Sequence, residues 1–297
     1  MTIFRPLTHA LFVALSLSVL SPVVFSVPQQ GTAPSAAAPA TPLLTRSATR
    51  HEVRHFGYGG TITVIGAPRG SITIEGWDKN EVDLTAEIEI QAPTEEDLQR
   101  LSVLNNFVFD EDSNHLRILS TGTHDKAFMK RVAKNFPKRL LGLPWKIDYR
   151  LRVPVLSDLE VNAGDGMIKL SGVEGAIQLT GRQADAQLTL TGGTVSVTVA
   201  SGTVNVNLPG RSWRGAGLEV QLAVGDLNVE MANGLNAYVD IEVLRTGKIN
   251  NSYPGFESRE RTEMTDRSIK ARSGTGGATL KFAVVEGSIA IKKKSEE

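Results

Sequence analysis

The sequence predicts an all-β fold in which short, glycine-punctuated strands stack as a β-solenoid or a single-stranded β-helix-like array. Val, Ile, Leu and Thr recur in short runs that alternate with polar residues, and this period of two is typical of half-buried strands. The chain contains 28 glycines, many of which separate these runs, whereas aromatic residues make up 6% of the sequence. A chain of 297 residues is long enough to bury a core of its own.

The first 50 residues differ in composition from the rest. Arg5 precedes an apolar run at 10–20 and a stretch of small residues, an order that predicts a secretory signal peptide at 1–26. A retained membrane anchor is the alternative, because no clean A-x-A cleavage motif follows. Pro, Ala, Thr and Ser dominate 27–50, which predicts a disordered linker. Because the chain has no cysteine, it is not a lipoprotein, and we expect it in the periplasm, in the medium or at the cell surface.

The range 51–124 is predicted to be an N-terminal β region with one short helix. Alternating runs predict strands at 61–64, 71–74, 81–90, 107–109 and 115–119. The helix is expected at about 94–104, because Thr94 suits the N-cap and Asp97 follows three residues later in a capping-box-like position.

A basic amphipathic insertion at 125–146 interrupts the strand pattern. The candidate contacts to an anionic membrane surface or another polyanion are Lys126, Lys130, Arg131, Lys134, Lys138, Arg139 and Trp145. The alternative is a helix or loop whose apolar side packs on the β-stack while its cations face solvent, and Pro137 and Pro144 weaken any long interfacial helix. The acidic residues of 95–97 and 110–112 offer a third explanation, in which they neutralise the insertion within the protein.

The range 147–297 is predicted to be a C-terminal β-repeat region. After a strand at 147–153, apolar runs follow one another at intervals of about nine or ten residues, with a longer gap near Trp213. The runs are centred on Ile168/Leu170, Ile177/Leu179, Leu188/Leu190, Val195/Val197/Val199, Val204/Val206/Leu208, Val220/Leu222 and Leu227/Val229, and continue at 239–243, 279–284 and 288–291. A strand this short cannot hide its apolar face alone, so the repeats must stack. The charged tail 292–297 is expected to cap the end of the stack.

The chain resembles the bacterial putative adhesin family, a group of exported glycine-rich β-repeat proteins. The motifs that carry the resemblance are Gly70-Ser-Ile-Thr-Ile-Glu-Gly-Trp77, the glycine-rich repeats of 164–229, and the closing runs at 276–282 and 287–291. The similarity extends from about His51 onward. It implies an exported, right-handed β-solenoid-like fold and brings no catalytic residues with it. The insertion at 125–146 departs from the family pattern.

His51-Glu52-Val53-Arg54-His55 matches the zinc peptidase pattern H-E-x-x-H. That chemistry requires a helix, because residues four apart converge on one metal only when they lie one helical turn apart. The flanking tether and glycines favour an extended chain, in which the two imidazoles lie about 13 Å apart. An edge strand is therefore the preferred interpretation, and a zinc metallopeptidase is the disfavoured alternative.

Two short motifs, Gly164-Asp165-Gly166 and Gly225-Asp226, faintly match a calcium-binding nonapeptide repeat. The periodic Asp that such a repeat needs at each turn is missing, so we expect ordinary Gly/Asp turns and no cofactor. The sequence also contains no G-x-S-x-G elbow and no phosphate-binding glycine loop.

These observations predict a non-enzymatic exported cell-envelope protein, an adhesin-like binding or scaffold module with an unknown protein or glycan ligand. Rows of Thr, Ser, Asn and Gln on the solvent face suit many weak hydrogen bonds, although any soluble repeat must expose such rows. No nucleic-acid partner is expected, because 32 basic and 32 acidic side chains cancel. The alternative is a periplasmic envelope component that contacts the membrane or a signalling partner through the basic insertion.

Overall fold

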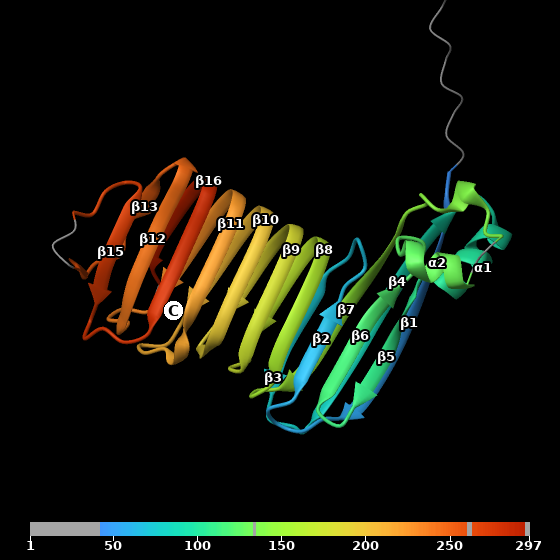
Figure 1. Cartoon of the computed structure of the whole chain (residues 1–297), viewed down its shortest axis with the longest axis horizontal. Helices are drawn as coiled ribbons and strands as arrows, with labels where there is room; N and C mark the ends of the chain where they lie inside the picture. Colours follow the sequence, from blue (N-terminus) through green and yellow to red (C-terminus); the bar gives the residue numbers. More distant parts are fainter. Residues whose placement is uncertain (1–41, 133–134, 260–262, 295–297) are drawn as a thin grey trace, which may run out of the picture. The chain divides into compact units, whose positions relative to one another are not determined.

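The computed structural model describes residues 42–132, 135–259 and 263–294. Sixteen strands within these ranges form one mixed sheet in the order β1-β4-β7-β3-β8-β9-β10-β11-β16-β12-β15-β14, with β2, β5, β6 and β13 attached at the side (Figure 1). Two α-helices and one 3-10 turn complete the described elements. The predicted all-β class is therefore confirmed, with one large mixed sheet as its architecture.

The bounds of the elements are as follows. The N-terminal part contains β1 (Leu44–His55), β2 (Thr61–Ile65), β3 (Ile72–Trp77), β4 (Glu81–Ala92), α1 (Glu95–Leu104), β5 (Asn106–Asp112), β6 (His115–Thr121), α2 (Lys126–Val132), η1 (Lys138–Leu140) and β7 (Trp145–Pro154). The remainder contains β8 (Asp158–Ser171), β9 (Ala176–Thr189), β10 (Gly192–Leu208), β11 (Arg214–Met231), β12 (Ala237–Thr246), β13 (Ile249–Asn251), β14 (Phe256–Ser258), β15 (Ser268–Ser273) and β16 (Thr279–Lys293).

Five long parallel strands, β8, β9, β10, β11 and β16, form the centre of the sheet, and we call them rungs. Leu159 pairs with Ile177 and Ile177 with Val195, so the first three rungs repeat every 18 residues. The register continues without a break through the second half of each rung, where Ile168 pairs with Ala186. Equivalent residues of neighbouring rungs therefore lie side by side, about 4.8 Å apart.

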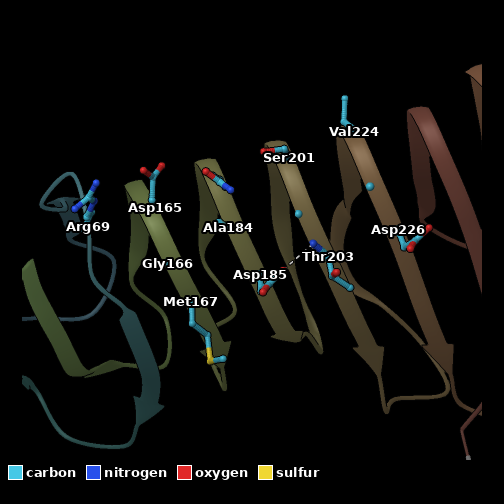
Figure 2. A pocket seen from close by; sticks show the side chains of 13 residues that line it. Arg69, Asp165, Gly166, Met167, Ala184, Asp185, Ser201, Thr203, Val224 and Asp226 are labelled. Atoms are coloured by element: carbon cyan, nitrogen blue, oxygen red, sulfur yellow. Dashed lines mark hydrogen bonds between the residues drawn. The ribbon is translucent and has the colours of Figure 1, made fainter. Parts of the chain in front are cut away.

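Each rung changes direction at its middle, and we call the residues at this point the corner ladder. Its members, in spatial order, are Gly70, Gly166, Ala184, Gly202, Gly225, Gly287 and Gly247. The glycines of the ladder have φ values between 128° and 146°, a region that other residues rarely adopt. A Cβ atom on Gly225 would also collide with the carbonyl oxygen of Gly202 on the next rung. Figure 2 shows Gly166 and Ala184 at this position on successive rungs.

Ala184 is the one member of the ladder that carries a side chain. Its methyl group points into the core, where it is 2% exposed. Gly181 makes this possible, because a Cβ at Gly181 would lie 3.0 Å from the Cβ of Ala184. The other rungs have Ala163, Val199 and Leu222 at the position of Gly181. The missing side chain at Gly181 therefore compensates for the extra one at Ala184.

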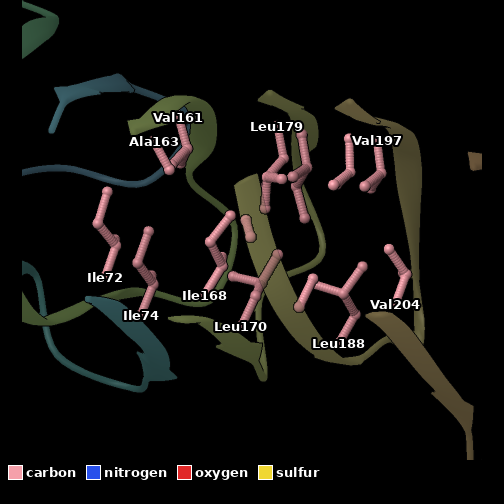
Figure 3. Packing of buried hydrophobic residues seen from close by; sticks show 14 of the residues in the cluster. Ile72, Ile74, Val161, Ala163, Ile168, Leu170, Leu179, Leu188, Val197 and Val204 are labelled. Atoms are coloured by element: carbon pink, nitrogen blue, oxygen red, sulfur yellow. The ribbon is translucent and has the colours of Figure 1, made fainter. Parts of the chain in front are cut away.

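The bend at the corner ladder lets the two halves of a rung cover each other's apolar side chains. We call the sheet surface built from the N-terminal halves the first face, and the one built from the C-terminal halves the second face. Figure 3 shows Val161, Leu179 and Val197 of the first face opposite Leu170 and Leu188 of the second. All five are at most 2% exposed, and burying a side chain of this size contributes roughly 1.5–3 kcal/mol. The core is therefore a narrow layer between two halves of the same strands.

The two faces separate at β8. The first half of β8 pairs with β2, and β2 continues the first face through β6 and β5. The second half of β8 pairs with β3, which continues the second face through β7, β4 and β1. Tyr149 of β7 and Phe107 of β5 fill the space between, with ring centroids 5.8 Å apart, and the Tyr149 hydroxyl lies 2.7 Å from the Ser120 hydroxyl.

The predicted helix at 94–104 is confirmed as α1. The Thr94 hydroxyl accepts the Asp97 N–H at 3.2 Å, as expected of an N-cap. Leu98 and Leu101 of α1 are both 1% exposed. The helix ends at Leu104, and Asn105 follows in an extended conformation.

Other expectations need correction. β1 begins at Leu44, so the predicted disordered linker 27–50 extends too far. The short runs of the second half are not separate strands, since Val195 and Val204 both belong to β10. The tail 292–297 was expected to cap the stack, but β16 lies between β11 and β12 inside the sheet. Residues 1–41, including the predicted signal peptide 1–26, lie outside the described residues and stay a prediction.

Replacing Gly225 with Ala tests the corner ladder. We expect the variant to lose at least about 2 kcal/mol of unfolding free energy, because a side chain at φ 136° is strained and its Cβ meets the Gly202 carbonyl. Gly142→Ala is the control, since no atom lies within 4 Å of a Cβ there. Urea unfolding of both variants measures the difference. Equal stability of the two would contradict this description of the corner.

Candidate functional site

The His51–His55 motif lies in β1, at one edge of the sheet. Thr85 and Glu81 of β4 are the antiparallel partners of His51 and His55, so the segment is extended. The imidazoles are therefore about 13 Å apart. This confirms the edge-strand prediction and removes the helical geometry that a zinc peptidase needs at these residues. Within the described ranges, no three His, Asp or Glu side chains come together in a way that could hold a metal ion.

The charged groups of the motif have other partners. The His51 Nε2 atom lies 2.9 Å from the Asp83 carboxylate. Arg50 donates a hydrogen bond to Glu52 at 3.2 Å, and Arg54 forms an ion pair with Glu52 at 2.9 Å. The hydrogen bond from Arg50, with the charge of Arg54, holds the pKa of Glu52 below its ordinary value. Glu52 is thus an ion-pairing residue of an edge strand, and a carboxylate with a lowered pKa suits general-base chemistry poorly.

Metal analysis of the purified chain should find no stoichiometric zinc. Two imidazoles on an extended strand cannot share one ion, so His51→Ala with His55→Ala should leave the metal content and the zinc-titration heat unchanged. One zinc ion per chain that disappears in the double variant would show that the strand geometry is wrong.

The aspartates of the calcium-like motifs accept hydrogen bonds from the neighbouring rung. Asp165 accepts two hydrogen bonds from the Arg182 guanidinium at 2.9 Å. Asp226 accepts the Ser288 hydroxyl at 2.6 Å and the Ser288 N–H at 3.3 Å. Asp185, two rungs from Asp226 in the same row, accepts the N–H of the intervening Thr203 at 2.9 Å. The predicted Gly/Asp turns are therefore corrected, because both motifs lie inside strands and their aspartates bridge neighbouring rungs.

A groove of about 880 Å³ runs along the corner ladder. Figure 2 shows its labelled side chains on successive rungs, with Asp165 and Ser201 on one side of the ladder and Asp185, Thr203 and Asp226 on the other. The sequence analysis did not predict this groove. Its lining residues come from successive rungs and line up only because the rungs pair in this register. In the sequence, the only feature that marks the groove is the repeated Gly next to Asp, Ser or Thr.

The basic insertion folds as two short helical pieces. α2 carries Lys126, Lys130 and Arg131, and η1 carries Lys138 and Arg139. Lys134 lies outside the described residues. The Asp125 carboxylate accepts the N–H groups of the second and third residues of α2, which explains where the helix begins.

The apolar side of the insertion packs against the sheet. Met129 is 9% exposed, and Leu140 is fully buried. Trp145 belongs to β7 and is 8% exposed, with its ring 5.3 Å from that of His124. Burial against the indole and its surroundings lowers the pKa of His124. Trp145 was predicted as a membrane or polyanion contact, and this is corrected because its side chain is part of the core.

Arg139 has a partner within the protein, although its side chain is 60% exposed. Its guanidinium donates two hydrogen bonds to the Asp97 carboxylate, at 2.6 and 2.8 Å. Asp97 is 1% exposed, so this ion pair fixes η1 against the start of α1. The Arg139 hydrogen bonds hold the pKa of Asp97 below its ordinary value.

The acidic residues near the insertion neutralise other cations. Glu95 pairs with Arg46, and Glu96 pairs with Arg100. Asp110 and Asp112 both pair with Arg117, at 3.0 Å. The Glu111 carboxylate lies 3.9 Å from Arg54. Among the described residues, Asp97 is the one of the six acidic residues at 95–97 and 110–112 that forms an ion pair with the insertion, and its partner is Arg139. Lys146, at the end of the insertion, pairs instead with Glu89 and Asp148.

Asp97→Asn should lower the stability of the fold in a pH-dependent way. The folded-state pKa of Asp97 is depressed, so its contribution is present above the unfolded-state pKa of about 3.9 and is lost as the pH falls through the lower folded value. The difference in urea midpoint between the wild type and the variant should be largest near pH 7 and shrink below about pH 4. If the difference in urea midpoint between the wild type and the variant does not change with pH, the ion pair between Asp97 and Arg139 does not contribute as described.

A second depression lies on the second face, where polar side chains of three rungs surround a hollow of about 190 Å³. Gln187, Asn205 and Asn228 occupy equivalent positions on β9, β10 and β11. Asn228 donates a hydrogen bond from Nδ2 to Asn205 Oδ1 at 3.0 Å. The buried Oδ1 atom of Asn207, on the wall of this hollow, has no hydrogen-bond partner among the described residues. The hollow therefore offers amide donors and acceptors in a regular row.

None of the described helices is both long and apolar enough to span a bilayer. No protein-family model matches the chain, and a search of curated proteins finds no match. Solved structures similar to this chain include a putative cell adhesion protein from Clostridium sporogenes, with 13% identity, a TM-score of 0.43, and coverage of 83% of this chain and 100% of the other. A putative adhesin from Bacteroides fragilis has 15% identity and a TM-score of 0.38, covering 86% and 99%. These values do not identify a ligand.

Proposed function

We propose that the chain is a non-enzymatic, exported envelope protein that acts as an adhesin-like binding module for a glycan. In this proposal the rungs form a solenoid-like scaffold, located in the periplasm or at the cell surface, and the second face carries the ligand. The observation on which the proposal depends is the row of amide side chains at Gln187, Asn205 and Asn228.

The repeat of the rungs supports an extended, repetitive ligand. Equivalent side chains recur about every 4.8 Å along the stack, so a polymer lying across β9, β10 and β11 meets an amide at each of these three steps. Amide groups donate and accept hydrogen bonds without charge, which suits the hydroxyl groups of sugars.

The corner groove supports a binding role less well. Its carboxylates already accept hydrogen bonds from Arg182, Thr203 and Ser288. The hollow on the second face retains amide groups beyond the single bond between Asn228 and Asn205. The second face is therefore the better surface for a ligand that binds through many weak hydrogen bonds.

Replacing Gln187, Asn205 and Asn228 together with Ala should weaken binding of the full chain to protease-treated peptidoglycan sacculi by at least about tenfold, because three hydrogen-bonding side chains of roughly 1 kcal/mol each are lost. The matched control changes Thr180, Thr198 and Gln221 to Ala, since these polar residues lie at equivalent positions on the first face. Co-sedimentation measures the affinity, and urea unfolding confirms that both variants fold.

Three results would contradict the proposal. The first is a wild type that does not sediment with the sacculi. The second is equal binding of the two triple variants. Binding to untreated sacculi that disappears after protease treatment would identify a protein ligand instead of a glycan.

A further inference from the structure

The start of the described chain, α1 and η1 lie at the same end of the sheet. Leu44, near the start of β1, pairs with Ala92 at the end of β4, directly before α1. Arg46 of β1 forms an ion pair with Glu95 of α1, and Arg139 of η1 binds Asp97 of the same helix. Figure 1 shows α1 and α2 beside these ends of β1 and β4. The sequence upstream of Leu44 therefore enters the sheet next to the basic insertion.

Four cations of the insertion remain exposed at this end, and we call them the basic end patch: Lys126, Lys130, Arg131 and Lys138. Within the described residues, none of the four forms a hydrogen bond or an ion pair through its side chain. The nearest opposing charge is Asp125, whose pKa is lowered mainly by hydrogen bonds from the α2 backbone and to a lesser extent by Arg131.

Two apolar side chains accompany these cations. Val132, the last residue of α2, is 48% exposed, and Leu141, directly after η1, is 42% exposed. Met129 and Leu140 of the insertion are buried within the fold, whereas Val132, Leu141 and the basic end patch are exposed. A purely structural role of the insertion explains the first two side chains and leaves the exposed groups unexplained. Cations around exposed apolar groups are typical of a surface that contacts lipid headgroups.

We propose that the basic end patch docks on an anionic lipid membrane and holds this end of the sheet against the bilayer. Opposite charge selects the partner, because four cations that form no ion pair within the described residues gain attraction from anionic headgroups. Val132 and Leu141 enter the interface, and the short length of α2 limits the contact to a shallow one. The apolar run 10–20 lies upstream of Leu44 in the sequence.

The absence of cysteine allows a direct test with single labels on the full chain. An environment-sensitive fluorophore is attached at Leu141→Cys, and in a control protein at Val224→Cys, which is 50% exposed on the corner groove. Phosphatidylglycerol-rich vesicles should shift the emission of the Leu141 label to shorter wavelength and leave the Val224 label unchanged. Phosphatidylcholine vesicles should shift neither, and salt should reverse the shift.

Neutralising the patch provides the matched comparison. Changing Lys126, Lys130, Arg131 and Lys138 to Gln should lower the vesicle affinity of the Leu141-labelled chain at least about tenfold. The control changes Arg211, Arg245, Lys248 and Lys281 to Gln, which removes the same charge from exposed positions elsewhere and should leave the affinity within about twofold.

The proposal is overturned if the Leu141 label does not respond to anionic vesicles, if both labels respond equally, or if the two quadruple variants lose affinity to the same extent. A response to a soluble polyanion such as polyphosphate, with none to vesicles, would also overturn it and would favour an acidic macromolecule as the partner. The vesicle test does not involve the second face. Its outcome is therefore the same whether the glycan proposal holds or fails.

Discussion

The close approach of backbones at the corner ladder is the constraint on which this architecture depends. Two halves of one strand can face each other only if the chain turns sharply at the middle, and at that point the next rung lies against it. Glycine meets both requirements, since it tolerates the positive φ and leaves room for the neighbouring carbonyl oxygen. Ala184 shows how strict the constraint is, because its methyl group is accommodated by a second glycine, Gly181, in the same rung.

This constraint also determines where binding surfaces arise. The interior is a thin layer of Val, Leu and Ile side chains from the two faces, so polar groups gather on the outside in rows set by the register. The amide row of the second face follows directly from that register. The basic end patch has a different origin, because it lies on an insertion that covers the opened end of the sheet. The two proposed surfaces therefore come from separate parts of the chain and can act independently.

Local pattern in the sequence predicted much of the fold. Alternation of apolar and polar residues identified the strands and the inward side chains such as Val195 and Val204, and the cap at Thr94 located α1. Local pattern could not show that two runs form one bent strand, since the corner looks like any glycine turn. It also could not place β16 between β11 and β12, because strand order depends on contacts distant in sequence. Trp145 was misassigned for a similar reason: its neighbours are basic, but β7 carries it into the core.

The distance across a single rung tests the central claim most directly. Spin labels on Cys residues introduced at Thr194 and Asn207, near the two ends of β10, report whether the strand is bent. With the bend, the labelled backbones lie on two packed layers about 10 Å apart, so the account predicts a label separation below about 30 Å. A straight strand of this length would separate the two residues by about 43 Å. A distribution centred near the longer distance would contradict the corner ladder and the two faces built on it.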